Sequence, residues 1–155
     1  MTNIAAGGRV PDVEFRLLSG KIVNPANFKG QKLVIFFCDG SDPLPCSRRL
    51  HSFADLATEF EHCGTWIIGL VSNPGRPGSL PDSDPPIVAL ALDPDDVVGA
   101  AFGLRPRDEE DGKSRVGREL TTFLIDRDGT VDRIWRDSSD KDQASEVLEA
   151  ARKLT

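Results

Sequence analysis

The sequence contains few of the residues that form disulfide frameworks and zinc sites. Its 155 residues include three cysteines and two histidines, and no pair of cysteines is spaced as CxxC. An odd number of cysteines without a framework spacing argues against structural disulfides, so we expect each cysteine to be a buried apolar residue or a reactive thiol. The two histidines, His51 and His62, lack the usual spacing of zinc ligands. We therefore expect neither a bound metal nor a cofactor.

The sequence also lacks a long apolar run and an excess of positive charge. No segment approaches the roughly 20 apolar residues of a membrane span, and the first ten residues lack the apolar core of a signal peptide. The formal net charge is -6, and the positive residues are scattered among acidic ones. We therefore expect a cytoplasmic protein that binds neither membranes nor nucleic acid.

Strands and helices are expected to alternate along a single domain spanning residues 1–155. Buried strands are predicted at 32–37, 65–71 and 87–92, hairpins at 13–23 and 120–135, and helices at 46–62, 93–103 and 140–154. Segment 73–86, which has five prolines, and the polar segment 105–118 are expected to be surface loops. This order predicts a three-layer α/β sandwich around a mixed sheet.

The spacing of apolar residues predicts which side chains face the core. In the helix at 46–62 these are Leu50, Phe53, Ala54, Ala57 and Phe60. In the last helix they are Ala144, Val147, Leu148 and Ala151. Trp66, in an apolar strand, is expected in the core, and Trp135 is expected to pack under the last helix. Asp93 and Pro94 are expected to begin the helix at 93–103.

The segment SDPLPC, residues 41–46, has the features of a helix start. Asp42 is a candidate N-cap, and Pro43 or Pro45 is a candidate first helical residue. Cys46 would then lie in the first turn, where unpaired N–H groups and the helix dipole favour a thiolate. From these residues alone two interpretations stay open. Cys46 is either a reactive nucleophile or a small apolar residue packed beneath the loop.

Several longer stretches occur in the order and spacing of one known family. They are GGRVPDVEF (7–15), LLSGKIVNPANFKGQKLVIFF (17–37), CSRRLHSFAD (46–55), LALDPDDVVGAAFGL (90–104) and TTFLIDRDGTVDRIW (121–135). Together they resemble the peroxiredoxin family of alkyl hydroperoxide reductases and thiol-specific antioxidants, and most closely its Q-type or bacterioferritin-comigratory branch. The resemblance implies a thioredoxin-like fold, in which helices flank a mixed central sheet and a β-hairpin lies at the N-terminus.

The resemblance also implies a thiol peroxidase that reduces hydrogen peroxide or organic hydroperoxides through a sulfenic acid at Cys46. Thioredoxin or a small thiol would be the reductant. In the family motif Pro-x-x-x-Thr-x-x-Cys, the Pro position is Asp39 and the Thr position is Pro43. Pro43 has no hydroxyl to orient a peroxide, and Asp39 and Asp42 add negative charge near a thiolate. The active-site motif is therefore degenerate.

The other residues that the resemblance implies are also out of place. The arginine that usually stands before the Thr-Thr-Phe-Leu run falls on Leu120, so Arg118 and Arg49 are candidate stabilisers of the thiolate and peroxide. His51 stands at the position where the family usually has its resolving cysteine. Cys38, eight residues before Cys46, is a possible resolving thiol or a buried apolar residue. Cys63, at the far end of the predicted helix, is expected to be structural or an intermolecular partner.

Three functions follow from these observations. The first is a thiol peroxidase, as a monomer or homodimer. The second is a catalytically weakened peroxiredoxin-like domain that serves as a redox sensor or protein-binding module, which the substitutions at Asp39 and Pro43 favour. The third, a thioredoxin-like reductase, needs a second cysteine three residues from the first, where Pro43 stands instead.

Overall fold

The computed structural model describes residues 7–17, 20–27, 30–39, 51–72, 88–93, 97–102, 121–136 and 143–154. Their strands are β1 (Phe15–Arg16), β2 (Ile22–Val23), β3 (Lys32–Asp39), β4 (Thr65–Ser72), β5 (Val88–Asp93), β6 (Thr121–Ile125) and β7 (Val131–Arg136). Their helices are the 3-10 helix Pro25–Asn27, α2 (Ala57–His62), α3 (Val97–Ala101) and α4 (Gln143–Lys153), and residues 51–55 are also helical. None of these helices is long and apolar enough to cross a membrane.

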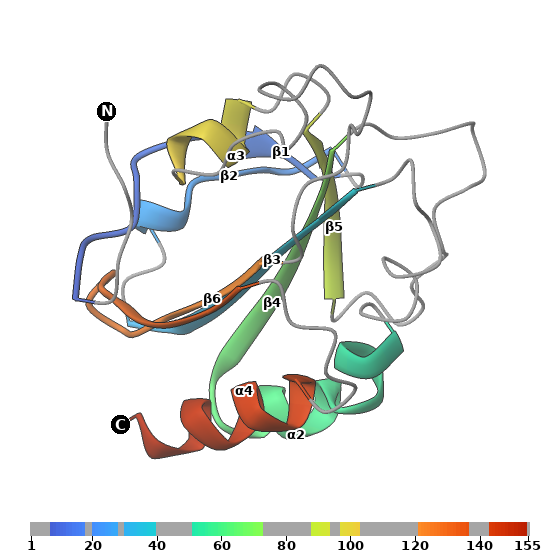
Figure 1. Ribbon diagram of the computed structural model, residues 1–155, viewed down its shortest axis with the longest axis vertical. Helices are drawn as coiled ribbons and strands as arrows, with labels where there is room; N and C mark the ends of the chain where they lie inside the picture. Colours follow the sequence, from blue (N-terminus) through green and yellow to red (C-terminus); the bar gives the residue numbers. More distant parts are fainter. Residues whose placement is uncertain are drawn as a thin grey trace.

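The central sheet is mixed and has the strand order β5-β4-β3-β6-β7 (Figure 1). Strand β3 pairs in parallel with β4 and antiparallel with β6. Strand β5 continues the parallel half, and β7 continues the antiparallel half. Strands β1 and β2 form a separate antiparallel hairpin, as the sequence predicts. The mixed sheet and the N-terminal hairpin confirm the expected fold class.

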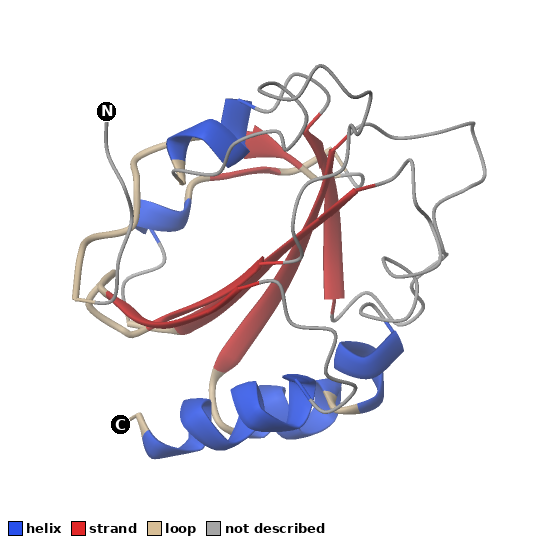
Figure 2. Ribbon diagram, viewed as in Figure 1, coloured by secondary structure: helices blue, strands red, loops and turns tan. Residues whose placement is uncertain are grey.

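Both faces of the central sheet are covered, which gives three layers (Figure 2). Side chains alternate along β3, so that Val34 and Phe36 enter one apolar cluster with α2 and α4. Leu33, Ile35 and Phe37 enter the other cluster, with the hairpin and α3. Because β3 is buried on both sides, its sequence is a continuous apolar run and not an alternating one.

The predicted helix at 46–62 is interrupted within its described part. Residues 51–55 and α2 are helical, but Leu56 between them is in a turn, where its N–H donates to the Phe53 carbonyl at 3.1 Å. Phe53, Ala57 and Phe60 are buried as predicted, whereas Ala54 is exposed and that prediction is wrong. The buried stripe of α2 continues to Phe53, which precedes the turn, and Ala54 lies beside that stripe.

The two tryptophans differ from each other in burial. Trp135 is 8% exposed, packs in the cluster that includes α4, and donates from Nε1 to Glu146 Oε1 at 3.2 Å, so the prediction for it is confirmed. Trp66 is 50% exposed, so its predicted place in the core is wrong. It shares a face of β4 with Ile68 and Leu70 but is the second residue of the strand. Figure 1 shows that this end of β4 lies away from the hairpin and α3.

Most other predicted elements are confirmed where the structure describes them. The hairpin of β6 and β7 turns at residues 126–129, and α4 buries all four of its predicted core residues. Asp93 is the last residue of β5, and Pro94 lies outside the described residues, so the helix start proposed there remains a prediction. The predicted loops at 73–86 and 105–118 also lie outside them.

A glycine in β4 makes room for an aromatic stack beneath the sheet. A Cβ atom at Gly69 would lie 2.6 Å from Cζ of Phe36 and 3.0 Å from Cδ2 of Leu90. The Phe36 ring in turn stacks on Phe53, with 5.0 Å between ring centroids and 7° between planes. Gly69 therefore allows the ring of Phe36 to lie flat between β4 and the helical residues 51–55.

Lys32 is the first residue of β3 and is almost fully buried, at 2% exposure. Its Nζ donates to the carbonyl oxygens of Ala151 at 2.6 Å and Leu154 at 3.0 Å, at the end of α4. A positive charge at a helix C-terminus is favourable, and these bonds satisfy carbonyls that lack partners within the helix. Burial lowers the pKa of Lys32 from its ordinary 10.5; the charge of Cys63 opposes the shift and that of Arg127 adds to it.

The close approach at Gly69 predicts a loss of stability on adding one methyl group. Gly69→Ala should lower the free energy of unfolding by about 1–3 kcal/mol, because the new methyl group displaces the Phe36 ring. Urea denaturation measures this. In a Phe36→Leu background the same substitution should be less damaging, because the ring atoms it meets are gone. Equal losses in both backgrounds would refute the steric explanation.

The lowered pKa of Lys32 predicts a pH dependence of stability. Between its pKa in the folded state and 10.5, the unfolded chain binds more protons at this position than the folded chain does. The free energy of unfolding of the wild type, relative to that of Lys32→Met, should therefore rise as pH is raised from neutral toward 10.5. Denaturant titrations of both proteins across this range measure the difference. A difference that falls with pH would contradict the prediction.

Candidate active site

The carboxyl end of β3 is where the sequence places the active site. Strand β3 extends two residues beyond the predicted 32–37, and its last two residues are Cys38 and Asp39. Their backbones pair with Val71 and Ser72, the last residues of β4. The backbone of the candidate resolving residue Cys38 is therefore at this edge of the sheet. So is that of Asp39, the position of the family proline.

Four of the candidate site residues lie outside the described residues. Cys46, Pro43 and Arg49 belong to segment 40–50, and Arg118 belongs to segment 103–120. Their assigned roles therefore remain predictions. The structure describes the elements on both sides of segment 40–50, which are β3 and the helical residues 51–55.

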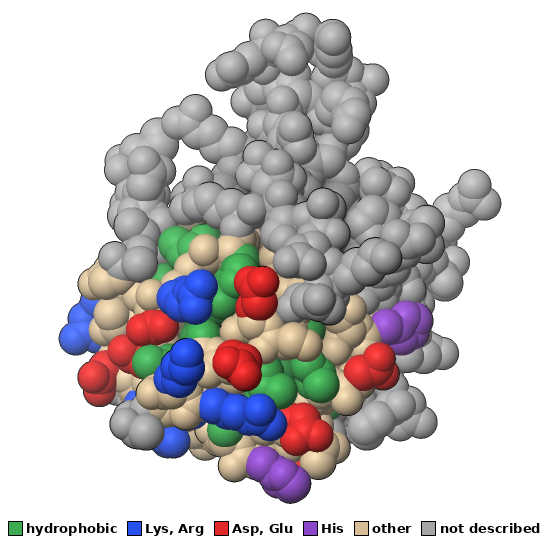
Figure 3. All heavy atoms as spheres, turned by 60° about the horizontal axis from the view of Figure 1, so that its bottom comes forward, with side chains coloured by type: hydrophobic (Ala, Val, Ile, Leu, Met, Phe, Trp, Pro, Cys, Tyr) green, Lys and Arg blue, Asp and Glu red, His purple; other side chains and the backbone are tan. Residues whose placement is uncertain are grey.

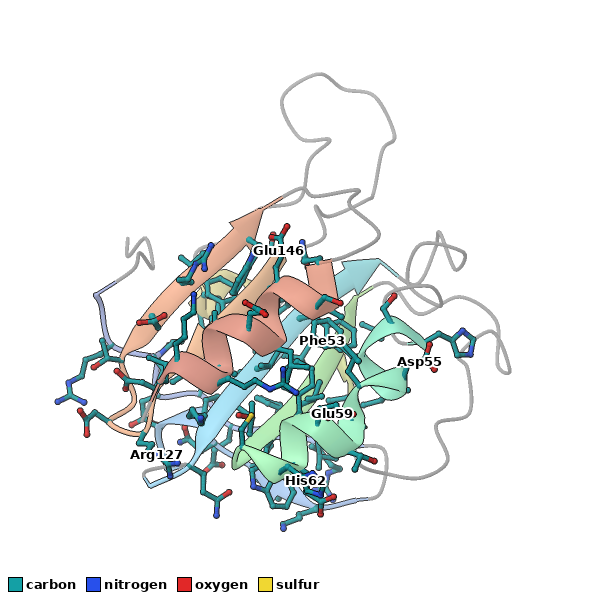
Figure 4. The ribbon with its side chains drawn as sticks, turned by 90° about the horizontal axis from the view of Figure 1, so that it is seen from below. Phe53, Asp55, Glu59, His62, Arg127 and Glu146 are labelled. Atoms are coloured by element: carbon teal, nitrogen blue, oxygen red, sulfur yellow. The ribbon has the colours of Figure 1, made fainter. Side chains whose placement is uncertain are left out.

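Phe53 fixes the helical residues 51–55 to the central strand. It is fully buried and stacks on Phe36, and its ring centroid lies 5.8 Å from that of Phe60. The other side chains of this stretch are exposed or half-buried, and His51 is among the exposed ones. Asp55 is also exposed and points away from the core (Figure 4). Because Phe53 follows Cys46 by seven residues, its ring determines where the chain resumes after the candidate nucleophile.

The sequence analysis did not predict a buried polar pair on the sheet face that carries Phe36. The Thr122 hydroxyl donates to Gln143 Oε1 at 2.7 Å, and both residues are 1% exposed. Thr122 lies in β6 opposite Phe36, and Gln143 is the first residue of α4. A signal was available in the sequence, because Gln143 precedes Val147 by four residues and so occupies the apolar stripe of its helix.

Cys63 lies just before the beginning of β4, whereas Cys38 lies near the end of the parallel neighbouring strand β3. Cys63 directly follows α2, and its Sγ lies 3.3 Å from the Phe60 carbonyl and 3.4 Å from Thr65 Oγ1. Thr65 begins β4, seven residues before Ser72 at the end of that strand, which is a separation of about 23 Å. The predicted structural role of Cys63 is compatible with this position.

The surface around α2 and α4 carries charges of both signs. Figure 3 shows Lys and Arg side chains interspersed with Asp and Glu on this face. Arg152 and Glu59 form an exposed ion pair at 3.5 Å, which joins α4 to α2. A pair of this kind stabilises by about 0–1 kcal/mol. Among the described residues, no group of three or more His, Cys, Asp and Glu side chains is arranged to hold a metal ion.

Comparison with known proteins identifies relatives along nearly the whole chain. A model of the AhpC/TSA family matches residues 6–134. Peroxiredoxin Bcp of Bacillus subtilis is 26% identical over 153 residues, which cover 98% of each chain. Peroxiredoxin Bcp of Escherichia coli is 24% identical over 149 residues, which cover 96% of each chain.

Solved structures give a similar result. A structure of Xanthomonas campestris peroxiredoxin Q has a TM-score of 0.78 and 25% identity over 92% of each chain. The bacterioferritin comigratory protein of the same organism, studied for its alkyl peroxide reduction, has a TM-score of 0.80 and 25% identity over 96% of each chain.

The contacts of Phe53 predict that its loss loosens the chain after segment 40–50. Phe53→Ala should lower the free energy of unfolding by about 3–5 kcal/mol, as expected for a buried aromatic residue. It should also speed amide hydrogen exchange at residues 51–55 more than in β3. Ala54→Ser, at an exposed neighbouring position, is the matched control and should change stability by no more than about 0.5 kcal/mol. Unchanged exchange at residues 51–55 would contradict the anchoring role.

Proposed function

Because the chain belongs to the AhpC/TSA family, we propose that it is a thiol peroxidase with Cys46 as the nucleophile. The observation that carries this proposal is the family match over residues 6–134. Cys46 lies within this range, and the sequence resemblance implies that it occupies the position of the motif cysteine. Its substrates are hydrogen peroxide or organic hydroperoxides. The reductant is thioredoxin or a small thiol, and the protein acts in the cytoplasm as a monomer or homodimer.

The reaction is a two-electron transfer from sulfur to peroxide. The Cys46 thiolate attacks one peroxide oxygen, so that an S–O bond forms while the O–O bond breaks. The second oxygen leaves with the bonding electrons, takes up a proton and departs as water or an alcohol. A reducing thiol then displaces water from the sulfenic acid to form a disulfide, and a second thiol reduces that disulfide.

Two features support Cys46 as the reacting residue. Segment 40–50 connects the carboxyl end of β3 to the helical residues anchored by Phe53, so the chain on both sides of Cys46 is held by the core. The sequence of that segment has the features of a helix start, where a thiolate is favoured.

The remaining roles are assigned by the same reasoning. Arg118 or Arg49 stabilises the thiolate and the developing charge, since the usual arginine position is Leu120. Cys38 is the candidate resolving thiol because its backbone lies at the same end of β3 as segment 40–50. Without a reaction at Cys38, the cycle uses one cysteine and an external thiol.

A second function is favoured by the motif itself. Asp39 and Pro43 replace the Pro and Thr of the family motif, and Pro43 removes a hydrogen-bond donor. An oriented donor to developing charge contributes about 3–4 kcal/mol, or 10² to 10³ in rate. A domain weakened in this way would serve as a redox sensor or protein-binding module.

The two functions differ in how fast Cys46 reacts with peroxide. For a peroxidase, the second-order rate constant for oxidation by hydrogen peroxide at neutral pH should exceed that of free cysteine by several orders of magnitude. Intact mass with a sulfenic-acid trap should show one label, and Cys46→Ser should lose it. A rate equal to that of free cysteine would overturn the peroxidase and leave the sensor or binding module.

Substitutions assign the groups involved. Cys46→Ser should abolish the fast reaction, whereas Cys63→Ser should leave it unchanged. Cys38→Ser should leave the first oxidation intact and block any internal disulfide. Arg118→Gln or Arg49→Gln should slow the oxidation if that side chain stabilises the reacting charge.

A further inference from the structure

We draw no further inference here: the strongest candidate, the side-chain cluster of Cys63, Thr65 and Lys32 between the end of α2 and the beginnings of β3 and β4, carries nothing because it holds a single thiol and no described residue around it points to a ligand.

Discussion

Strand β3 is buried on both faces, and the elements around the candidate site take their positions from it. Its side chains from Lys32 to Phe37 are at most 2% exposed, because α2 and α4 cover one face and the hairpin and α3 cover the other. A strand held from both sides cannot shift its register without moving apolar side chains between two cores. The carboxyl end of β3 is therefore a fixed point from which the chain enters segment 40–50.

The same burial fixes the point at which the chain returns from that segment. Gly69 leaves space for the ring of Phe36, and Phe36 stacks on Phe53 at 5.0 Å. Because Gly69 has no side chain, the Phe36 ring can lie close to β4. The position of that ring in turn determines how closely residues 51–55 approach the sheet. Because a close-packed core transmits small volume changes, we expect a methyl group added at Gly69 to displace residues 51–55.

The parts of the fold that follow from local pattern could be read from the sequence. Apolar runs predicted the central strands, and helical spacing predicted the buried face of α4. Periodicity did not show the turn at Leu56, because the residues on each side keep their apolar spacing across it. The exposure of Trp66 depends on where the covering layer ends, which is a tertiary property. The contacts of Lys32 and Gln143 were missed for a related reason, since each joins the sheet to α4 from far along the chain.

The two buried polar groups differ in how completely their hydrogen bonds are made. At one end of the sheet the Lys32 ammonium has two carbonyl acceptors from the end of α4, so its contacts are supplied by the fold itself. At the other end Gln143 has one partner, and its Nε2 has none among the described residues. The fold therefore supplies acceptors to the Lys32 ammonium and, at Gln143, the hydroxyl donor of Thr122, so both groups join the sheet to α4 through hydrogen bonds between residues far apart in the sequence.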